Sequence, residues 1–412
     1  MSGKCDMCGE YAAEGATSCG ECGRALAECS MCRAFAERGF ACCGVCGRPI
    51  TKCPKCESFV AQGSAFCGGC GRPVAECTRC DYYEKEGAAF CGGCGRALKD
   101  PNAGLGPAGV IFILLSAFVL FVLIFELFTL VINSPDTVAF LENTGRYYFV
   151  IMPFPERIFD IDGVALQLFW VAEIIIILAC AAYAIMKFVK ALTPSKGGLT
   201  KDSVENTAVF WVSVFLSASM AIGFTVSLIL ILTGNEPTVP DFGDTVEQMY
   251  GMADAAVWEE IVARLLLIGV PMMIVSLIAT KKKESLLCIF GGFGMSGAAF
   301  VFIIVSGVIF GLAHYPGWDD QLWKVLTTAI MGVFLGYVFV RFGLYAAILL
   351  HFINNYLSAF NWMGADALLI WIFLMLVIAG FGALAYIIYR MATSKETIKS
   401  LPAFRNNFVK SR

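Results

Sequence analysis

Histidine is almost absent from this sequence: its 412 residues include only His314 and His351. Charged residues are also scarce, at 15%, whereas hydrophobic residues make up 58%. The formal net charge of −3 excludes a general electrostatic attraction to nucleic acid. This length and composition predict a membrane protein that crosses the bilayer several times and carries a separate polar head.

Cysteine is almost absent from the apolar part of the chain. Of the 19 cysteines, 17 precede residue 95, and only Cys180 and Cys288 follow. These two stand alone in apolar segments and are interpreted as core residues. No signal peptide precedes the cysteine-rich head, so we expect the head in the cytosol, where thiols stay reduced and bind metal.

The head, residues 1–96, consists of four repeats of 24 residues. Each contains Cys-x2-Cys-x10-Cys-x2-Cys and ends in Cys-Gly-x-Cys-Gly-Arg. Paired Cys-x2-Cys turns are typical of tetrahedral zinc sites, and so short a unit needs a metal to fold. We therefore predict four structural zinc ions. The predicted ligands are Cys5, Cys8, Cys19, Cys22, Cys29, Cys32, Cys43, Cys46, Cys53, Cys56, Cys67, Cys70, Cys77, Cys80, Cys91 and Cys94.

Two pairings of these cysteines are conceivable. Pairing within each repeat uses all sixteen and leaves Cys42 as a spare thiol, whereas a shifted pairing leaves the first and last Cys-x2-Cys turns without partners. We favour the pairing within repeats. The units resemble tandem zinc ribbons of prokaryotic proteins, which suggests a head that docks a protein partner or senses a signal. Four zinc ions, each bound by four thiolates, would give the head a net charge of about −8, which argues against binding to the phosphates of nucleic acid.

The remainder is predicted to be an all-α polytopic membrane domain of about eight transmembrane helices. A linker at 97–107 leads to three accessory spans within 108–233, an extracytoplasmic loop at 234–256, a core at 257–390 and a basic cytosolic tail at 391–412. Each predicted span is an apolar window that can cross about 30 Å of hydrocarbon. The spans are 108–132, 164–187, 208–233, 257–280, 286–313, 323–341, 343–361 and 366–390.

Loop charges predict the orientation of these spans. Lysines at 187–201 and 281–283, Arg341, and the basic tail fall on one side. The loop at 234–256 contains five acidic and no basic residues, although the loop at 133–163 contains Arg146 and Arg157. By the positive-inside rule, we expect a cell-membrane protein with both termini in the cytosol.

Ionisable residues inside the apolar spans mark a candidate site, because such residues are costly in a bilayer. Glu260 and Arg264 are spaced i,i+4, so they can pair on one face of a helix, with Glu259 beside them. His351 and Asn355 share a face in the same way. With His314, these residues are expected to converge in the outer half of the bilayer. Glu126 and Glu173 also lie within spans, but no partner or role can be named for them.

The motifs Glu259-Glu260-x3-Arg264, Phe310-x3-His314 and His351-x3-Asn355 resemble those of the CAAX prenyl protease and bacteriocin-processing (CPBP) family of intramembrane proteases. The resemblance covers roughly residues 250–365. It implies peptide-bond hydrolysis by a glutamate-centred site without metal. Glu259 would be the general base and share the water with His314. His351 and Asn355 would donate hydrogen bonds to the oxyanion, while Glu260 and Arg264 would hold the site.

The same ionisable residues also fit other interpretations. The same residues suit helix packing, and Glu259, His314 and His351 are acceptable zinc ligands. A catalytically inactive scaffold or immunity-type protein could bind a partner peptide in the same pocket. A zinc-responsive sensor is disfavoured because closed four-thiolate sites are typical of structural zinc. The predicted substrate is a protein or peptide in the membrane, and nothing in the sequence indicates a prenylated one.

The zinc assignment predicts four zinc ions per chain, measured by metal analysis of the purified full-length protein. Cys43→Ser should remove one ion, because it breaks a four-thiolate set, whereas the neighbouring Cys42→Ser should remove none. Two ions per chain, or equal losses in the two variants, would contradict the pairing within repeats.

Overall fold

The computed structural model describes the second part of the chain almost completely. The described residues are 32–37, 106–149, 157–193, 199, 201–238, 240, 243–318 and 321–393. The chain divides into a unit of Met1–Gly106 with Ser195–Thr200 and a unit of Pro107–Pro194 with Lys201–Arg412. In the first unit the structure describes helix α2 (Cys32–Glu37). The other fifteen predicted zinc ligands lie outside the described residues.

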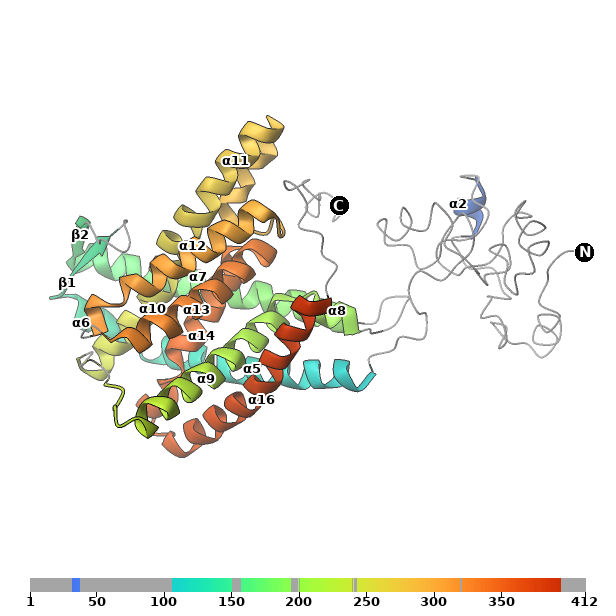
Figure 1. Ribbon diagram of the computed structural model, residues 1–412. Helices are drawn as coiled ribbons and strands as arrows, with labels where there is room; N and C mark the ends of the chain where they lie inside the picture. The colour runs from blue at the N-terminus through green and yellow to red at the C-terminus, as the bar shows by residue number, and fades with distance from the viewer. Residues whose placement is uncertain are drawn as a thin grey trace, which may run out of the picture. The chain divides into compact units, whose positions relative to one another are not determined.

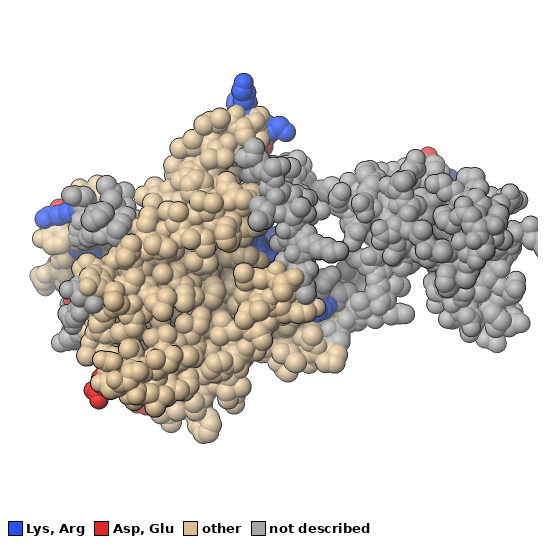
Figure 2. Space-filling model, in the orientation of Figure 1, with Lys and Arg blue, Asp and Glu red and all other residues tan. Residues whose placement is uncertain are grey.

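The second unit is helical and apolar, which confirms a polytopic membrane protein (Figure 1). Among the described residues, six helical segments are long and apolar enough to cross a membrane. Figure 2 shows a face of this unit with few charged side chains, as expected for a surface in lipid. Five of the six segments are α5 (Gly106–Ile132), α7 (Gly163–Leu192), α9 (Ala208–Leu232), α13 (Leu322–Phe342) and α16 (Asp366–Thr393).

The sixth segment is a run of 36 residues from Thr245 to Thr280. It comprises α10 (Thr245–Glu260), the π-helix η2 (Ile261–Gly269) and α11 (Val270–Thr280). The Asp244 side chain caps α10 by accepting a hydrogen bond from the Glu247 N–H at 2.9 Å. The second half of the segment predicted as a loop, residues 245–256, is therefore helical, and the helix begins 12 residues before the predicted start of the span at 257.

The predicted span 286–313 is not one helix. The 3₁₀-helix η3 (Lys283–Phe290) is followed by a non-helical turn and then by α12 (Gly297–Ala313). Three glycines in the turn, Gly291, Gly292 and Gly294, have positive φ angles, which L-residues rarely adopt. A Cβ at Gly291 would lie 2.3 Å from the Phe339 carbonyl oxygen, so the turn packs directly on α13.

The predicted span 343–361 is also interrupted. Helix α14 (Leu344–Tyr356) has 13 residues, or about 20 Å at 1.5 Å per residue, and the short helix α15 (Ala359–Trp362) follows it. The predicted spans 323–341 and 343–361 are separated by a single residue and so require a tight turn, which Gly343 makes with a φ of 113°. Because α14 is short and mostly buried, it belongs to the protein core rather than to the lipid-facing surface.

Helices α12 and α13 cross closely at glycines whose spacing, Gly307-x3-Gly311 and Gly332-x3-Gly336, is typical of close helix contacts in membranes. A Cβ at Gly332 would lie 2.9 Å from the Gly307 Cα, and one at Gly311 would lie 2.6 Å from the Val325 carbonyl oxygen. The two backbones therefore approach too closely for any larger residue. This crossing fixes the end of α12, where His314 lies.

A two-stranded antiparallel sheet departs from the all-α prediction. After the short helix α6 (Ser134–Leu141), strand β1 (Gly145–Phe149) pairs with β2 (Arg157–Asp162) in the loop at 133–163. The Arg146 guanidinium lies 3.1 Å from Asp254 on α10, and the Tyr148 hydroxyl donates to the same carboxylate at 3.3 Å. Arg146, one of the two basic residues in the loop at 133–163, is thus neutralised by the buried Asp254.

The hairpin also packs on the helix turn that precedes Glu259. The rings of Tyr148 and Phe159 lie edge-on to Trp258, at centroid distances of 4.9 and 5.8 Å. Burial lowers the pKa of Arg146, but Asp254 and two tyrosines raise it by more, so the guanidinium stays charged. The hairpin therefore fixes α10 through both charge and ring contacts.

Arg146→Met should destabilise the protein by about 1–3 kcal/mol, because it leaves the buried Asp254 carboxylate without its cation. Arg157→Met is the matched control in the same hairpin. Its partner Asp160 is exposed, and such a pair contributes about 0–1 kcal/mol. Thermal unfolding in detergent measures the loss of stability in both variants. Equal losses in the two variants would show that the hairpin does not hold α10 through Arg146.

Candidate functional site

A fully buried ion pair joins Glu260, the last residue of α10, to Arg264 in η2. The Arg264 Nε lies 3.2 Å from Glu260 Oε2, and both side chains are 0% exposed. The predicted i,i+4 pairing is therefore present. Segments of π-helix often occur at functional sites, and this one carries the arginine. The pair allows two charges to remain in an apolar interior, where either alone would be very costly.

Helix α12 supports the arginine from the other side. The Arg264 Nη1 donates to the Ser306 hydroxyl at 2.8 Å, and Ser306 donates to the Ala263 carbonyl at 2.6 Å. The guanidinium carbon also lies 4.6 Å from the centroid of the Phe310 ring. The sequence did not single out Ser306, because a serine in an apolar helix resembles an ordinary small packing residue.

Glu259 faces both histidines of the chain. Its Oε2 lies 4.0 Å from the Nε2 of His314 and 3.8 Å from the Nε2 of His351. This oxygen is buried, and it has no hydrogen-bond partner among the described residues. Both separations are too long for direct hydrogen bonds and suit a bridging water. The structure therefore brings Glu259, His314 and His351 together, as predicted.

The hydrogen bond at the other nitrogen of His314 defines its tautomer. His314 lies just beyond the end of α12, and its Nδ1 is 2.8 Å from the Phe310 carbonyl oxygen. A carbonyl only accepts, so Nδ1 carries the hydrogen and leaves the Nε2 lone pair toward Glu259. Burial lowers the pKa of His314, although Glu259 opposes this shift. A neutral ring can accept a hydrogen bond at Nε2.

His351 is held in a different way. Its Nδ1 lies 2.9 Å from Oε1 of the same Glu260 that pairs with Arg264. An ionised carboxylate only accepts, so Nδ1 donates, and Nε2 carries a second hydrogen only when the ring is protonated. Glu260 thus connects the buried arginine to the imidazole that faces Glu259.

Asn355 lies one turn after His351 on α14, with its neighbour Asn354. The Asn354 amide donates to Asn355 Oδ1 at 3.3 Å, and Ser219 of α9 donates to Asn354 Oδ1 at 3.4 Å. This arrangement leaves the Asn355 amide as a donor, with a 3.5 Å contact to the Met252 carbonyl. Neither Asn354 nor Ser219 was predicted, since their contact depends on two helices far apart in the sequence.

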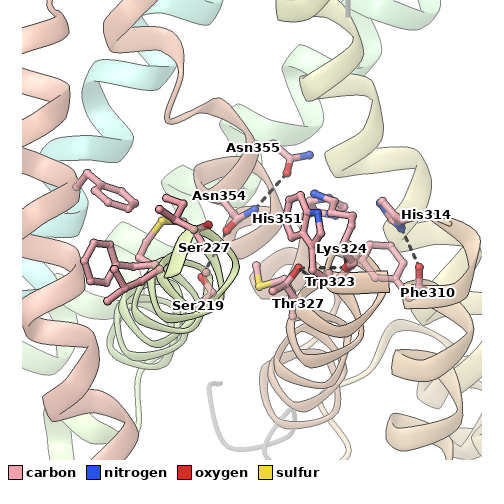
Figure 3. A pocket seen from close by; sticks show the side chains of 18 residues that line it. Ser219, Ser227, Phe310, His314, Trp323, Lys324, Thr327, His351, Asn354 and Asn355 are labelled. Carbon is pink, nitrogen blue, oxygen red and sulfur yellow. Dashed lines mark hydrogen bonds between the residues drawn. The ribbon is translucent and has the colours of Figure 1, made fainter. Parts of the chain in front are cut away.

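A cavity of about 550 Å³ opens beside these residues (Figure 3). His314, His351 and Asn355 line one part of it, and α9 and α13 form its walls. Glu259 contacts both imidazoles but is not itself among the lining residues. Lys324 of α13 also lines the cavity, with its amino group 3.6 Å from the centroid of the Trp318 ring. The volume lies in the range of small-ligand pockets.

The two acids without an assigned role, Glu126 and Glu173, have different surroundings. Both carboxylate oxygens of Glu126 on α5 are buried and lack a hydrogen-bond partner among the described residues. Glu173 on α7 lies beside Asp254 in the cluster that anchors the hairpin. Across the part of the chain that the structure describes, no group of three or more His, Cys, Asp or Glu is placed to hold a metal ion.

Ser306→Ala should destabilise the protein by about 1–3 kcal/mol, because the buried Arg264 loses the acceptor of its Nη1 hydrogen. Ser116→Ala is the matched control, since that hydroxyl is buried on α5 without a hydrogen-bond partner among the described residues. Its removal should cost little. Thermal unfolding curves of the two variants test this, and a larger loss for Ser116→Ala would contradict the assignment.

Comparisons with known proteins bear on the same region. Residues 248–357 match the family model described as Type II CAAX prenyl endopeptidase Rce1-like. All six predicted site residues in the membrane domain lie within this match, whereas α5, α7, α9 and α16 lie outside it. No curated protein and no solved structure matches the chain. Over residues 248–357 the chain is therefore similar to Rce1-like type II CAAX prenyl endopeptidases.

Proposed function

We propose that this protein is an intramembrane endopeptidase that hydrolyses a peptide bond of a membrane-associated protein or peptide. One observation carries the proposal. The buried Oε2 of Glu259 lies 3.8–4.0 Å from two imidazole nitrogens that line or border a cavity. A water molecule held there would have a base on one side and an acceptor, His314, on the other.

Glu259 acts as the general base in the proposed reaction. The water donates one hydrogen bond to Glu259 and one to His314 Nε2. As its oxygen attacks the peptide carbonyl carbon, Glu259 takes the first proton, and the carbonyl oxygen becomes an oxyanion. Collapse of the tetrahedral intermediate breaks the C–N bond, and Glu259 returns the proton to the leaving amine. The products are a carboxylic acid, which keeps the second proton of the water until it ionises, and an amine. All atoms of the peptide and the water are then accounted for, and no redox or metal step is needed.

Asn355 and His351 stabilise the oxyanion in this proposal. The Asn355 amide donates one hydrogen bond, and His351 Nε2 donates a second when its ring is protonated. The buried Glu260 carboxylate accepts the hydrogen bond from Nδ1 of this ring and so fixes its orientation. Donors fixed before the reaction cost no reorganisation, and each contributes about 2.7–4 kcal/mol in comparable sites. Glu260 and Arg264 would therefore act on the reaction indirectly, by holding His351.

Glu259→Gln should lower the rate of peptide hydrolysis by about 100-fold or more, because it removes the proton acceptor and keeps the shape. Glu126→Gln is the matched control, since it removes another buried intramembrane carboxylate. Its hydrolysis rate should stay near that of the wild type. The assay is single-turnover cleavage of a quenched peptide in detergent or liposomes.

Other outcomes of this assay separate the alternatives. Full biological function of Glu259→Gln would make the cavity a peptide-binding surface of a scaffold rather than an active site. A chelator should spare the activity of a chain whose predicted zinc head has been deleted. Activity that the chelator abolishes and zinc restores would assign Glu259, His314 and His351 to a metal and overturn the water-base mechanism.

The head and the orientation remain part of the same proposal. We infer that residues 1–96 bind four structural zinc ions and dock a protein partner in the cytosol, where both chain ends would lie. The charge of the loops and the four cysteine repeats support this inference. The catalytic steps above do not depend on the head.

A further inference from the structure

We propose that helix α9 forms a subsite for one large apolar side chain of the peptide substrate, and that Gly223 sets its size. This inference rests on the proposed function, because it names the substrate class of the same cavity. Helix α9 lies outside the residues that match the family model. The subsite would therefore be a property of the accessory part of this chain.

The lining of the cavity differs in polarity between its two sides. Near the candidate site its lining includes His314, His351 and Asn355. On the side formed by α9 and α16, most of the lining side chains are apolar. They are Met220, Phe224, Leu228 and Ile231 of α9 and Phe373 of α16. A peptide bond placed beside His314, His351 and Asn355 would direct a neighbouring side chain toward this apolar wall.

Gly223 lies in the middle of the α9 wall, and its role differs from that of the packing glycines. A Cβ built on Gly223 meets no heavy atom within 4 Å, although the residue lines the cavity. By contrast, a Cβ on Gly380 of α16 would lie 2.1 Å from the Ser217 carbonyl oxygen of α9. Gly380 thus permits helix contact, whereas Gly223 leaves space open in the cavity.

Hydroxyl groups on the walls favour a peptide over a lipid chain as the occupant. Ser219 and Ser227 of α9 and Thr327 of α13 line the same cavity as the apolar side chains. An extended peptide has backbone N–H and C=O groups that hydrogen-bond such hydroxyls, whereas a hydrocarbon chain has none. A cavity with both kinds of lining suits a peptide with a large apolar side chain next to the bond that is cut.

The test uses the full-length protein and a peptide library that varies one residue on either side of the scissile bond. At one of these positions the wild type should prefer Leu or Phe over Ala by about 10-fold or more in kcat/KM. Gly223→Phe should reduce or reverse this ratio, because the new ring occupies the subsite. Gly382→Phe is the matched control, since Gly382 is an exposed α16 glycine whose Cβ also meets nothing within 4 Å. Its ratio should equal that of the wild type.

A binding measurement separates failure of the subsite from failure of the proposed protease function. Peptides with a photoreactive benzophenone side chain at that position should crosslink to α9 in the Glu259→Gln protein. Gly223→Phe should abolish this crosslink, and Gly382→Phe should keep it. Crosslinking without any cleavage by the wild type would support the subsite and refute the protease.

Three results would overturn the subsite itself. One is cleavage by the wild type with an unchanged Leu-to-Ala ratio in Gly223→Phe. Another is the absence of any α9 crosslink. The third is a co-purified lipid that mass spectrometry detects in the wild type and not in Gly223→Phe, because a lipid chain would then be the occupant.

Discussion

The buried ion pair between Glu260 and Arg264 is the interaction on which the candidate site depends. Each charge would be very costly alone in an apolar interior, so each requires the other. Arg264 also contacts Ser306 and Phe310 on α12, and Glu260 holds Nδ1 of His351 on α14. One pair therefore connects three helical segments. Its neighbour Glu259 is left free to face the two imidazoles.

Accessory parts of the chain complete this arrangement from outside the Rce1-like region. The β-hairpin holds α10 through Arg146 and Tyr148, immediately before the two glutamates. Helix α9 supplies one wall of the cavity and contacts Asn354 through Ser219. In this account the motifs within residues 248–357 define the chemistry, while α9 borders the cavity that a substrate would enter.

Local spacing made much of the site predictable from the sequence. The i,i+4 separations of Glu260 and Arg264 and of His351 and Asn355 hold on any helix, and the glycine pairs of α12 and α13 behave as their spacing indicates. The unforeseen parts depend on tertiary contacts. A polar loop gives no periodic signal for the hairpin, and the break after η3 arises from positive-φ glycines within an apolar run. Ser306 and Ser219 matter only through partners on distant helices.

The central claim is that Glu259 activates a water molecule and does not attack the peptide itself. A single turnover in ¹⁸O-labelled water tests it directly, with enzyme prepared in ordinary water. Attack by water places one ¹⁸O atom in the new carboxylate of the product and leaves Glu259 unlabelled. Unlabelled product together with ¹⁸O in the Glu259 carboxylate, detected by mass spectrometry of the digested enzyme, would reveal a covalent intermediate and contradict the account.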